Sequence, residues 1–188
     1  MPKGLKPADL GLFVFGLAYP PLVFMLRGTV DASVFVVVAL AGLGLRFAWM
    51  DAKARYWRPA LLLSAVAIGS LALLDPALAS RAYPVVVSLA VAGIFAVTLA
   101  RPPSLVEKLA LASGEVWSLG LRAYCRNVTV VWALWLTINA VIAASLALVG
   151  NDQAWMLWTG AISYLVSGLL FATEWLVRRN LIKQRLRQ

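Results

Sequence analysis

Histidine is absent from this sequence, and cysteine occurs once, as Cys125. Without histidine, the chain cannot build a His-containing zinc site or a Ser-His-Asp or Cys-His nucleophile, and one thiol cannot form an intramolecular disulfide. Charge is also scarce, because only 13% of the residues are charged and only 8 of them are acids. No P-loop or dinucleotide-binding fingerprint occurs. We therefore expect no cofactor, no metal site and no catalytic residue of the usual hydrolase kinds.

Apolar residues are abundant instead. They make up 62% of the 188 residues, and the mean hydropathy is +0.85. Soluble domains are only about half apolar, and a helix needs about 20 apolar residues to cross a hydrocarbon core of roughly 30 Å. Six candidate stretches lie at residues 9–26, 32–50, 59–74, 82–100, 128–149 and 154–177. The sequence predicts an all-α, polytopic membrane protein in which residues 1–188 form one domain with six transmembrane helices.

Two adjacent prolines, Pro20 and Pro21, lie inside the first predicted helix. Each removes a backbone hydrogen bond that lipid cannot replace. We therefore expect the first helix to be kinked there, or to be divided at Tyr19.

The distribution of Lys and Arg predicts the orientation. With six helices, 15 of the 17 basic residues fall on one side, and only Arg27 and Arg81 fall on the other. Short loops rich in Lys and Arg stay in the cytoplasm. We expect a multi-pass protein of the bacterial inner membrane, with both termini cytoplasmic.

The net charge of +9 then reflects an excess of basic residues at the cytoplasmic leaflet over the opposite leaflet. The basic residues border membrane helices and have no groove-reading or base-stacking context, so we expect anionic lipid headgroups as partners and no nucleic acid. The basic tail, residues 178–188, has the composition of a helix that continues along the inner leaflet. The sequence leaves the oligomeric state open, and a homo-oligomer is compatible with it.

The segment 101–127 is the one substantial polar stretch. Ser104 and Glu107 are spaced as in a capping box, in which each side chain bonds the amide of the other residue at the start of a helix. An apolar stripe follows, made of Leu105, Leu109, Ala112 and Val116. This spacing predicts a cytoplasmic interfacial amphipathic helix, which is either a plain connector or a docking surface for a protein or lipid. The candidate docking residues are Ser104, Glu107, Lys108, Arg122, Arg126, Arg178 and Arg179.

Asn139 lies near the middle of the fifth predicted helix, where an unpaired amide is costly. The short connection to the sixth helix makes the two helices antiparallel neighbours, and counting outward from it puts Asn139 level with Ser163 and Tyr164, with Ser167 one turn beyond. We predict a contact between Asn139 and one of these three residues. It either holds the helices together or lines a polar pocket for a substrate.

Arg46 and Glu174 are the ionisable residues most nearly inside the membrane. Both lie within about 6 Å of the cytoplasmic ends of their helices at 1.5 Å per residue, so their side chains can reach the interface. Their shared depth and opposite charge suggest an ion pair. With Asn139, Ser163 and Tyr164, they are the candidates for contact with a lipid or substrate.

The C-terminal half resembles an uncharacterised family of small bacterial membrane proteins that are found with aryl-polyene, xanthomonadin-like pigment genes. The resemblance rests on residues 101–110 (RPPSLVEKLA), on residues 124–132 and Asn139, and on residues 168–179 (GLLFATEWLVRR). The order of elements also resembles the intracellular septation protein A family. These resemblances imply an inner-membrane protein of the cell envelope, associated with lipid-pigment synthesis or with wall and division machinery. They imply no established reaction and no catalytic residue.

Three function classes follow from these observations. The first is a non-enzymatic accessory or scaffold protein in envelope or lipid-pigment biosynthesis, with a protein partner on its cytoplasmic face. The second is a carrier of a lipid or lipid-linked intermediate, which a lipid groove between helices would favour. The third is a membrane enzyme acting on lipid headgroups, which a cytoplasmic cleft gathering several of the acids and arginines would favour. Of these three classes, the sequence favours a function that is not enzymatic.

Overall fold

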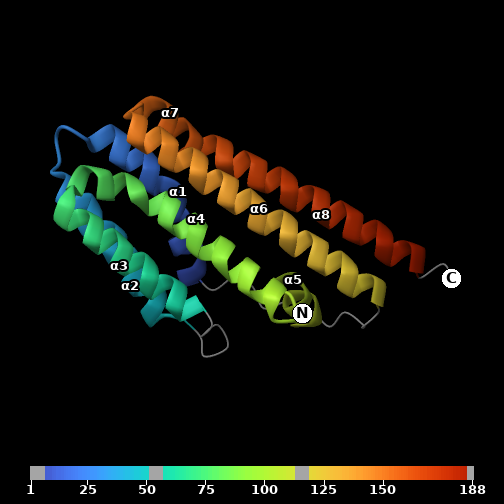
Figure 1. Cartoon of the computed structure of the whole chain (residues 1–188). Coiled ribbons are helices and arrows are strands. Elements are labelled where there is room, and N and C mark those ends of the chain that lie inside the picture. The colour runs from blue at the N-terminus through green and yellow to red at the C-terminus, as the bar shows by residue number, and fades with distance from the viewer. Residues whose placement is uncertain (1–6, 51–56, 113–118, 186–188) are drawn as a thin grey trace.

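The computed structural model describes residues 7–50, 57–112 and 119–185, and this part of the chain consists of helices joined by short turns, with no β-strand. The helices are α1 (Pro7–Leu26), α2 (Ala32–Ala48), α3 (Arg58–Leu74), α4 (Pro76–Ala100), α5 (Leu105–Ala112), α6 (Leu119–Val149), α7 (Asp152–Leu157), the π-helical turn η2 (Trp158–Ile162) and α8 (Ser163–Arg185) (Figure 1). The expected all-α fold is confirmed.

Helix α4 lies at the centre of the bundle (Figure 1). It packs most extensively on α6 and α3, and α2 contacts both α3 and α4. The buried residues on α4 and α6 are mostly small, among them Ala82, Ala92, Ala140 and Ala143. Small side chains let two helix backbones approach closely, which is how helices pack when lipid competes for every apolar surface.

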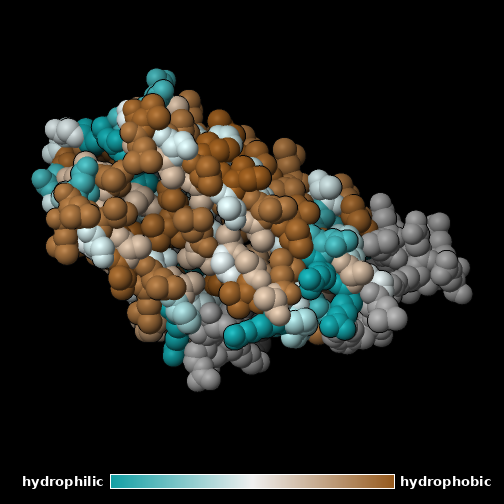
Figure 2. All heavy atoms as spheres, viewed as in Figure 1, coloured by the Kyte–Doolittle hydropathy of each residue, from teal (hydrophilic) through white to brown (hydrophobic). Residues whose placement is uncertain are grey.

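Within the described residues, three helical segments are long and apolar enough to cross a membrane: Pro76–Ala100, Gly120–Val149 and Asp152–Arg179. Helices α2 and α3 are also apolar but have 17 residues each. Figure 2 shows a broad hydrophobic surface on this face of the bundle, with hydrophilic residues gathered toward its two ends. An apolar band between two polar ends is the surface expected of a protein that lies in a bilayer.

An ionic cluster joins three turns at one end of the bundle. The Asp152 carboxylate, at the start of α7, pairs with Arg27 after α1 and with Arg81 in the first turns of α4; the Arg81 Nη2–Asp152 Oδ1 distance is 3.1 Å. The end of α1 and the starts of α4 and α7 are therefore at the same level.

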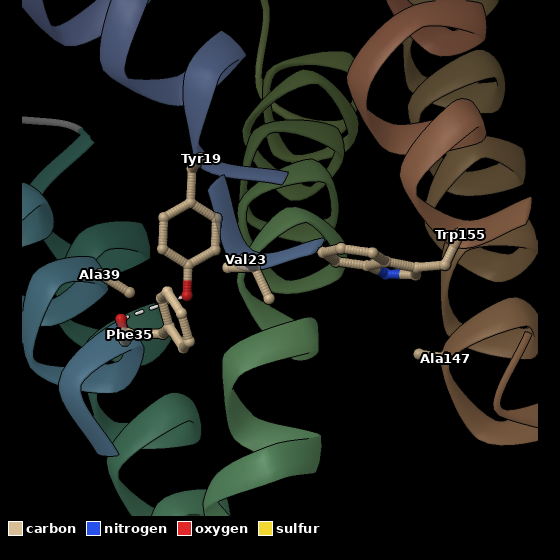
Figure 3. Close-up of a cluster of buried hydrophobic side chains, with 6 residues drawn as sticks. All are labelled: Tyr19, Val23, Phe35, Ala39, Ala147 and Trp155. Atoms are coloured by element: carbon tan, nitrogen blue, oxygen red, sulfur yellow. Dashed lines mark hydrogen bonds between the residues drawn. The ribbon is translucent and has the colours of Figure 1, made fainter. Parts of the chain in front are cut away.

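Tyr19 of α1 anchors the largest buried cluster, with Val23, Phe35, Ala39, Ala147 and Trp155 (Figure 3). Its hydroxyl lies 3.2 Å from the Phe35 carbonyl oxygen and 3.0 Å from that of Ser80, and it can donate to either. Helix α1 is continuous through Pro20 and Pro21, so the expected division at Tyr19 is not formed. The buried tyrosine ties this part of α1 to two other helices, and that packing supports the turn that the prolines weaken.

The prolines of α1 pack against the π-helical turn. A Cβ on Gly160 of η2 would lie 3.3 Å from the Cδ and Cγ atoms of Pro21, so only glycine fits there without a shift. Wider π-helical turns inserted into α-helices often occur where a helix must accommodate a neighbour or a functional group. Here the π-helical turn packs against the prolines of α1. It also divides the sixth predicted helix into α7, η2 and α8.

The fifth predicted helix begins earlier than expected. Helix α6 starts at Leu119, so residues 119–127 belong to it and do not form a separate interfacial segment. Its first turns have tertiary partners: Cys125 is buried against Val106 and Ala110 of α5, and the Tyr124 hydroxyl donates to the Glu174 carbonyl of α8 at 3.2 Å. The expected segment 101–127 is therefore wrong in its second half, and residues 113–118 lie outside the described residues.

Candidate functional site

An open groove of about 460 Å³ runs along the bundle between α3 and α4. Its walls are almost entirely apolar and include Leu63 of α3 with Leu89, Ile94 and Val97 of α4. Gly93 forms part of the wall, and a Cβ placed on it would meet no atom within 4 Å. The groove is therefore open at this position partly because Gly93 has no side chain to fill it.

Two cations stand at one end of this groove. Arg101 directly follows the last residue of α4, and Lys108 lies on α5, and both side chains are exposed. Among the residues that the structure describes, no carboxylate forms an ion pair with either of them. The groove thus combines a long apolar wall with a positively charged mouth.

Helix α5 is held in place by side chains from α4 and α6. The first free amides of a helix need acceptors from outside it. The Leu105 amide donates to the Thr98 hydroxyl of α4 at 3.0 Å, and the Val106 amide donates to the Thr129 hydroxyl of α6 at 3.4 Å. These two bonds fix the start of α5 against α4 and α6, and Lys108, one turn further along α5, lines the groove.

The predicted capping box is half formed. The Ser104 amide donates to Glu107 Oε2 at 3.0 Å, as expected, but the buried Ser104 hydroxyl makes no hydrogen bond. Glu107 is only 5% exposed, and its Oε1 lies 3.7 Å from Arg122 Nε. The carboxylate is therefore turned toward α6 and does not face the groove.

The structure describes only part of the predicted apolar stripe. Val106 and Ala110 face Cys125 of α6, and of the stripe residues Leu105 is buried whereas Leu109 is 55% exposed. The stripe was read over twelve residues, but α5 ends at Ala112 and Val116 lies outside the described residues. The face that α5 buries depends on the hydrogen bonds that hold its first turn against α4 and α6.

The predicted contact of Asn139 with α8 is also wrong. Asn139 Nδ2 donates to the Ser88 hydroxyl of α4 at 3.0 Å, and its Oδ1 accepts from Trp158 Nε1 at 2.9 Å. The register was right, because Trp135 and Ser167, each four residues away from the expected pair, are hydrogen-bonded at 2.9 Å. The side chain points to α4, which sequence spacing along α6 and α8 does not reveal.

The predicted ion pair between Arg46 and Glu174 is not formed. Glu174 Oε1 lies 3.0 Å from Arg178 Nε, one turn further along the same helix. Arg46 is exposed on α2, which packs against α1, α3 and α4, on the far side of α4 from α8 (Figure 1). Equal depth in the membrane did not bring the two residues together, because depth says nothing about position around the bundle.

The other candidates lie apart from the groove. Ser163 is buried and donates to the Thr159 carbonyl, and Tyr164 is half-buried on α8. The Arg126 Nη1 atom donates to the Leu99 carbonyl at 3.1 Å, near the end of α4, while the Arg179 guanidinium lies 5.3 Å from the centre of the Trp175 ring. Of the candidate residues predicted from the sequence, only Lys108 lines the groove.

Sequence reasoning missed the groove itself. Ala60, Ala90 and Gly93 are small residues on the two helices that form it, and they are the one signal the sequence contained. Small residues equally indicate close helix packing, as they do between α4 and α6. Only the arrangement of α3 and α4 distinguishes the two cases.

Comparison of the chain with protein-family models, with curated proteins and with solved structures gives no match. The functional assignment therefore rests on the site itself.

Proposed function

We propose that this protein spans the bacterial inner membrane six times, with both termini in the cytoplasm. Three of the described segments are long and apolar enough to cross, and α1, with 20 residues, is about 30 Å long. Helices α2 and α3, at about 25 Å each, fall only a little short of a roughly 30 Å core. The ionic cluster of Arg27, Arg81 and Asp152 supports alternate crossing, because it joins three turns that a six-pass chain has on one side. The groove end with Arg101 and Lys108 then faces the cytoplasm.

We further propose that the protein binds a lipid, or a lipid-linked intermediate, by holding its apolar chain in the groove between α3 and α4. The observation that carries this proposal is the groove itself, an apolar hollow on the surface that faces the bilayer. Ligand sites are typically concave and mostly apolar, with a few polar groups that set orientation. A lipid chain is the apolar molecule that such a surface meets in a membrane.

This proposal favours the carrier hypothesis over the scaffold and membrane-enzyme hypotheses. The polar atoms of Asn139 are bonded to protein, which argues against a substrate pocket at the membrane midplane. Glu107 and Glu174 face different arginines, Arg122 and Arg178, and do not converge on one cleft as a headgroup enzyme would need. The resemblance to the pigment-associated family suggests that the lipid belongs to envelope or lipid-pigment synthesis.

Photo-crosslinking tests the proposal. The full-length protein in lipid nanodiscs is irradiated with a phosphatidylcholine analogue that has a diazirine in one acyl chain, and the labelled peptides are identified by mass spectrometry. We expect labelling to be concentrated on the α3 and α4 residues around Leu63, Gly93 and Val97. A Gly93→Leu variant should reduce this labelling several-fold, because a Cβ at residue 93 meets no atom within 4 Å, the leucine side chain would occupy the groove, and leucine favours a helix.

The matched control is Gly168→Leu on α8. Gly168 is also exposed, and a Cβ on it also meets no atom within 4 Å, but it lies outside the groove. This variant should label as the parent protein does. Equal labelling in all three proteins, or labelling spread evenly over α6 and α8, would mean that the groove holds no lipid.

A further inference from the structure

The charged mouth of the groove identifies the headgroup of its ligand. We infer that the groove takes an anionic lipid of the cytoplasmic leaflet, whose acidic headgroup lies between Arg101 and Lys108. This inference rests on the proposed function and goes beyond it, since a chain-binding groove alone would accept neutral and anionic lipids equally.

The first argument is the depth of the groove. Along α4 its lining extends from Leu89 to Arg101, which at 1.5 Å per residue is about 18 Å. Half of a hydrocarbon core is about 15 Å thick. The groove therefore runs from the membrane surface at Arg101 to about the midplane, which is the depth that one lipid chain occupies in one leaflet.

The second argument is charge. Arg101 directly follows α4 and Lys108 lies on α5, yet both line the same end of the groove. Within the described part of the chain neither has an acidic partner. The nearest acid in sequence, Glu107, is buried against Arg122 and bonded to the Ser104 amide, so it does not neutralise Lys108. A guanidinium fork and an ammonium group together suit the oxygens of a phosphate.

The third argument is that hydrogen bonds within the protein hold the residues of the groove mouth in place. Thr98 lines the groove, and its hydroxyl also accepts the Leu105 amide that fixes the start of α5. Lys108 is therefore positioned by the same residue that forms the groove wall. At the opposite end of the bundle, a cavity of about 430 Å³ is lined by Arg27 and Arg81, but both of these arginines pair with the Asp152 carboxylate, and Asp31 also lines the cavity. Among the described residues, that cavity therefore lacks the two cations without acidic partners that line the groove.

The experiment is a lipid competition followed by native mass spectrometry. The full-length protein is released from nanodiscs containing equal amounts of dioleoyl phosphatidylglycerol and dioleoyl phosphatidylcholine, which have the same chains and differ in headgroup charge. We expect the parent protein to retain the anionic lipid about 25-fold more often than the neutral one, since two basic residues line the groove mouth and each basic residue near a membrane surface contributes roughly a factor of five. Arg101→Gln with Lys108→Gln should remove most of this preference, leaving about equal retention of the two lipids, while the neutral lipid still binds.

The matched control removes two other exposed cations, Arg46 and Arg179, by substitution with Gln. It has the same net charge as the test variant and should keep the preference. Loss of the preference in both double variants would overturn the inference in favour of a diffuse effect of surface charge. An unchanged preference in the test variant would overturn it as well, and would leave the groove proposal standing.

Gly93→Leu separates the two proposals. It should abolish retention of both lipids, and if it retains both, the proposed function itself fails. Circular dichroism checks that each variant is folded; should the double variant lose helix, Lys108→Gln alone provides the test, because its exposed side chain has no partner among the described residues that the change would break. A halving or more of the headgroup preference is then expected, and no change would contradict the inference.

Discussion

At the scale of single residues, polar side chains inside the bundle are bonded across helices. Asn139 joins Ser88 of α4 to Trp158 of η2, and Trp135 joins α6 to Ser167 of α8. Water is scarce in a bilayer core, so an amide or indole N–H there needs a protein partner. These bonds connect α6 to α4, η2 and α8 at a depth where apolar contacts alone give little preference for one helix over another.

Substitution of Asn139 by leucine tests this connection. The change leaves the Trp158 indole N–H and the Ser88 hydroxyl without their shared partner, and it should lower the free energy of unfolding by about 1 kcal/mol. The measurement is unfolding by SDS in mixed micelles, followed by circular dichroism. Thr137→Val is the control, because the Thr137 hydroxyl bonds only the Ala133 carbonyl of its own helix. If both variants lose the same stability, the Asn139 bonds contribute nothing specific.

At the scale of elements, α5 shows how a short helix depends on its neighbours. A helix of 8 residues is too short to be stable by itself in water, because nucleation is costly. Here Thr98 and Thr129 accept its first amides, and Val106 and Ala110 pack on Cys125. Its position over the groove is therefore a property of three helices together.

Thr98→Val is expected to loosen α5. Valine keeps the shape of threonine but removes the acceptor of the Leu105 amide, which typically costs about 1 kcal/mol at a helix start. Hydrogen exchange of the amides in 105–112 should then become about fivefold faster, while the amides of α4 and α6 away from the contact keep their protection.

Thr173→Val on α8 is the matched variant for this experiment. The Thr173 hydroxyl is exposed and bonds only the Leu169 carbonyl of its own helix. Exchange in 105–112 should be unchanged in it. Unchanged exchange in Thr98→Val would show instead that apolar packing alone holds α5.

At the scale of the whole molecule, the helices alternate between two polar ends. One end contains the cluster of Arg27, Arg81 and Asp152, and the other contains Arg101, α5 and the first turns of α6. Of the basic residues that the structure describes, only Arg27 and Arg81 belong to the first end, so the positive-inside rule predicts that the second end faces the cytoplasm.

Single cysteines test this orientation. In a Cys125→Ala background, Thr29→Cys and Gln153→Cys place thiols at the first end, and Arg179→Cys places one at the second; all three positions are exposed. A membrane-impermeant maleimide should label the first two in intact spheroplasts and the third only after lysis. Labelling of Arg179→Cys before lysis would mean the inverse orientation, and different behaviour of Thr29→Cys and Gln153→Cys would mean a different number of crossings.

Much of the fold could be predicted from the sequence, but little of the site could. The apolar runs predicted the bounds of α1, α2 and α3 to within two residues, and the end of α4, because burying backbone polar groups in lipid leaves few alternatives to a helix. The start of α4 lies six residues earlier than expected, at Pro76. The start of α6 was missed by nine residues, since its polar first turns are stabilised by α5 and α8 and not by lipid. The partners of Asn139 and Glu174 were wrong for the related reason that each depends on how a helix is rotated.

The sequence by itself determined that the chain is helical, where its helices lie and which end is basic. These properties follow from local composition, since a run of apolar residues or a cluster of lysines and arginines has the same meaning in any arrangement. The tertiary structure alone decided that α3 and α4 leave a groove at Gly93, and that Arg101 and Lys108 meet at its mouth. Apolar residues that face lipid, a neighbouring helix or a groove look alike in a sequence, and only packing assigns each of them to one of the three.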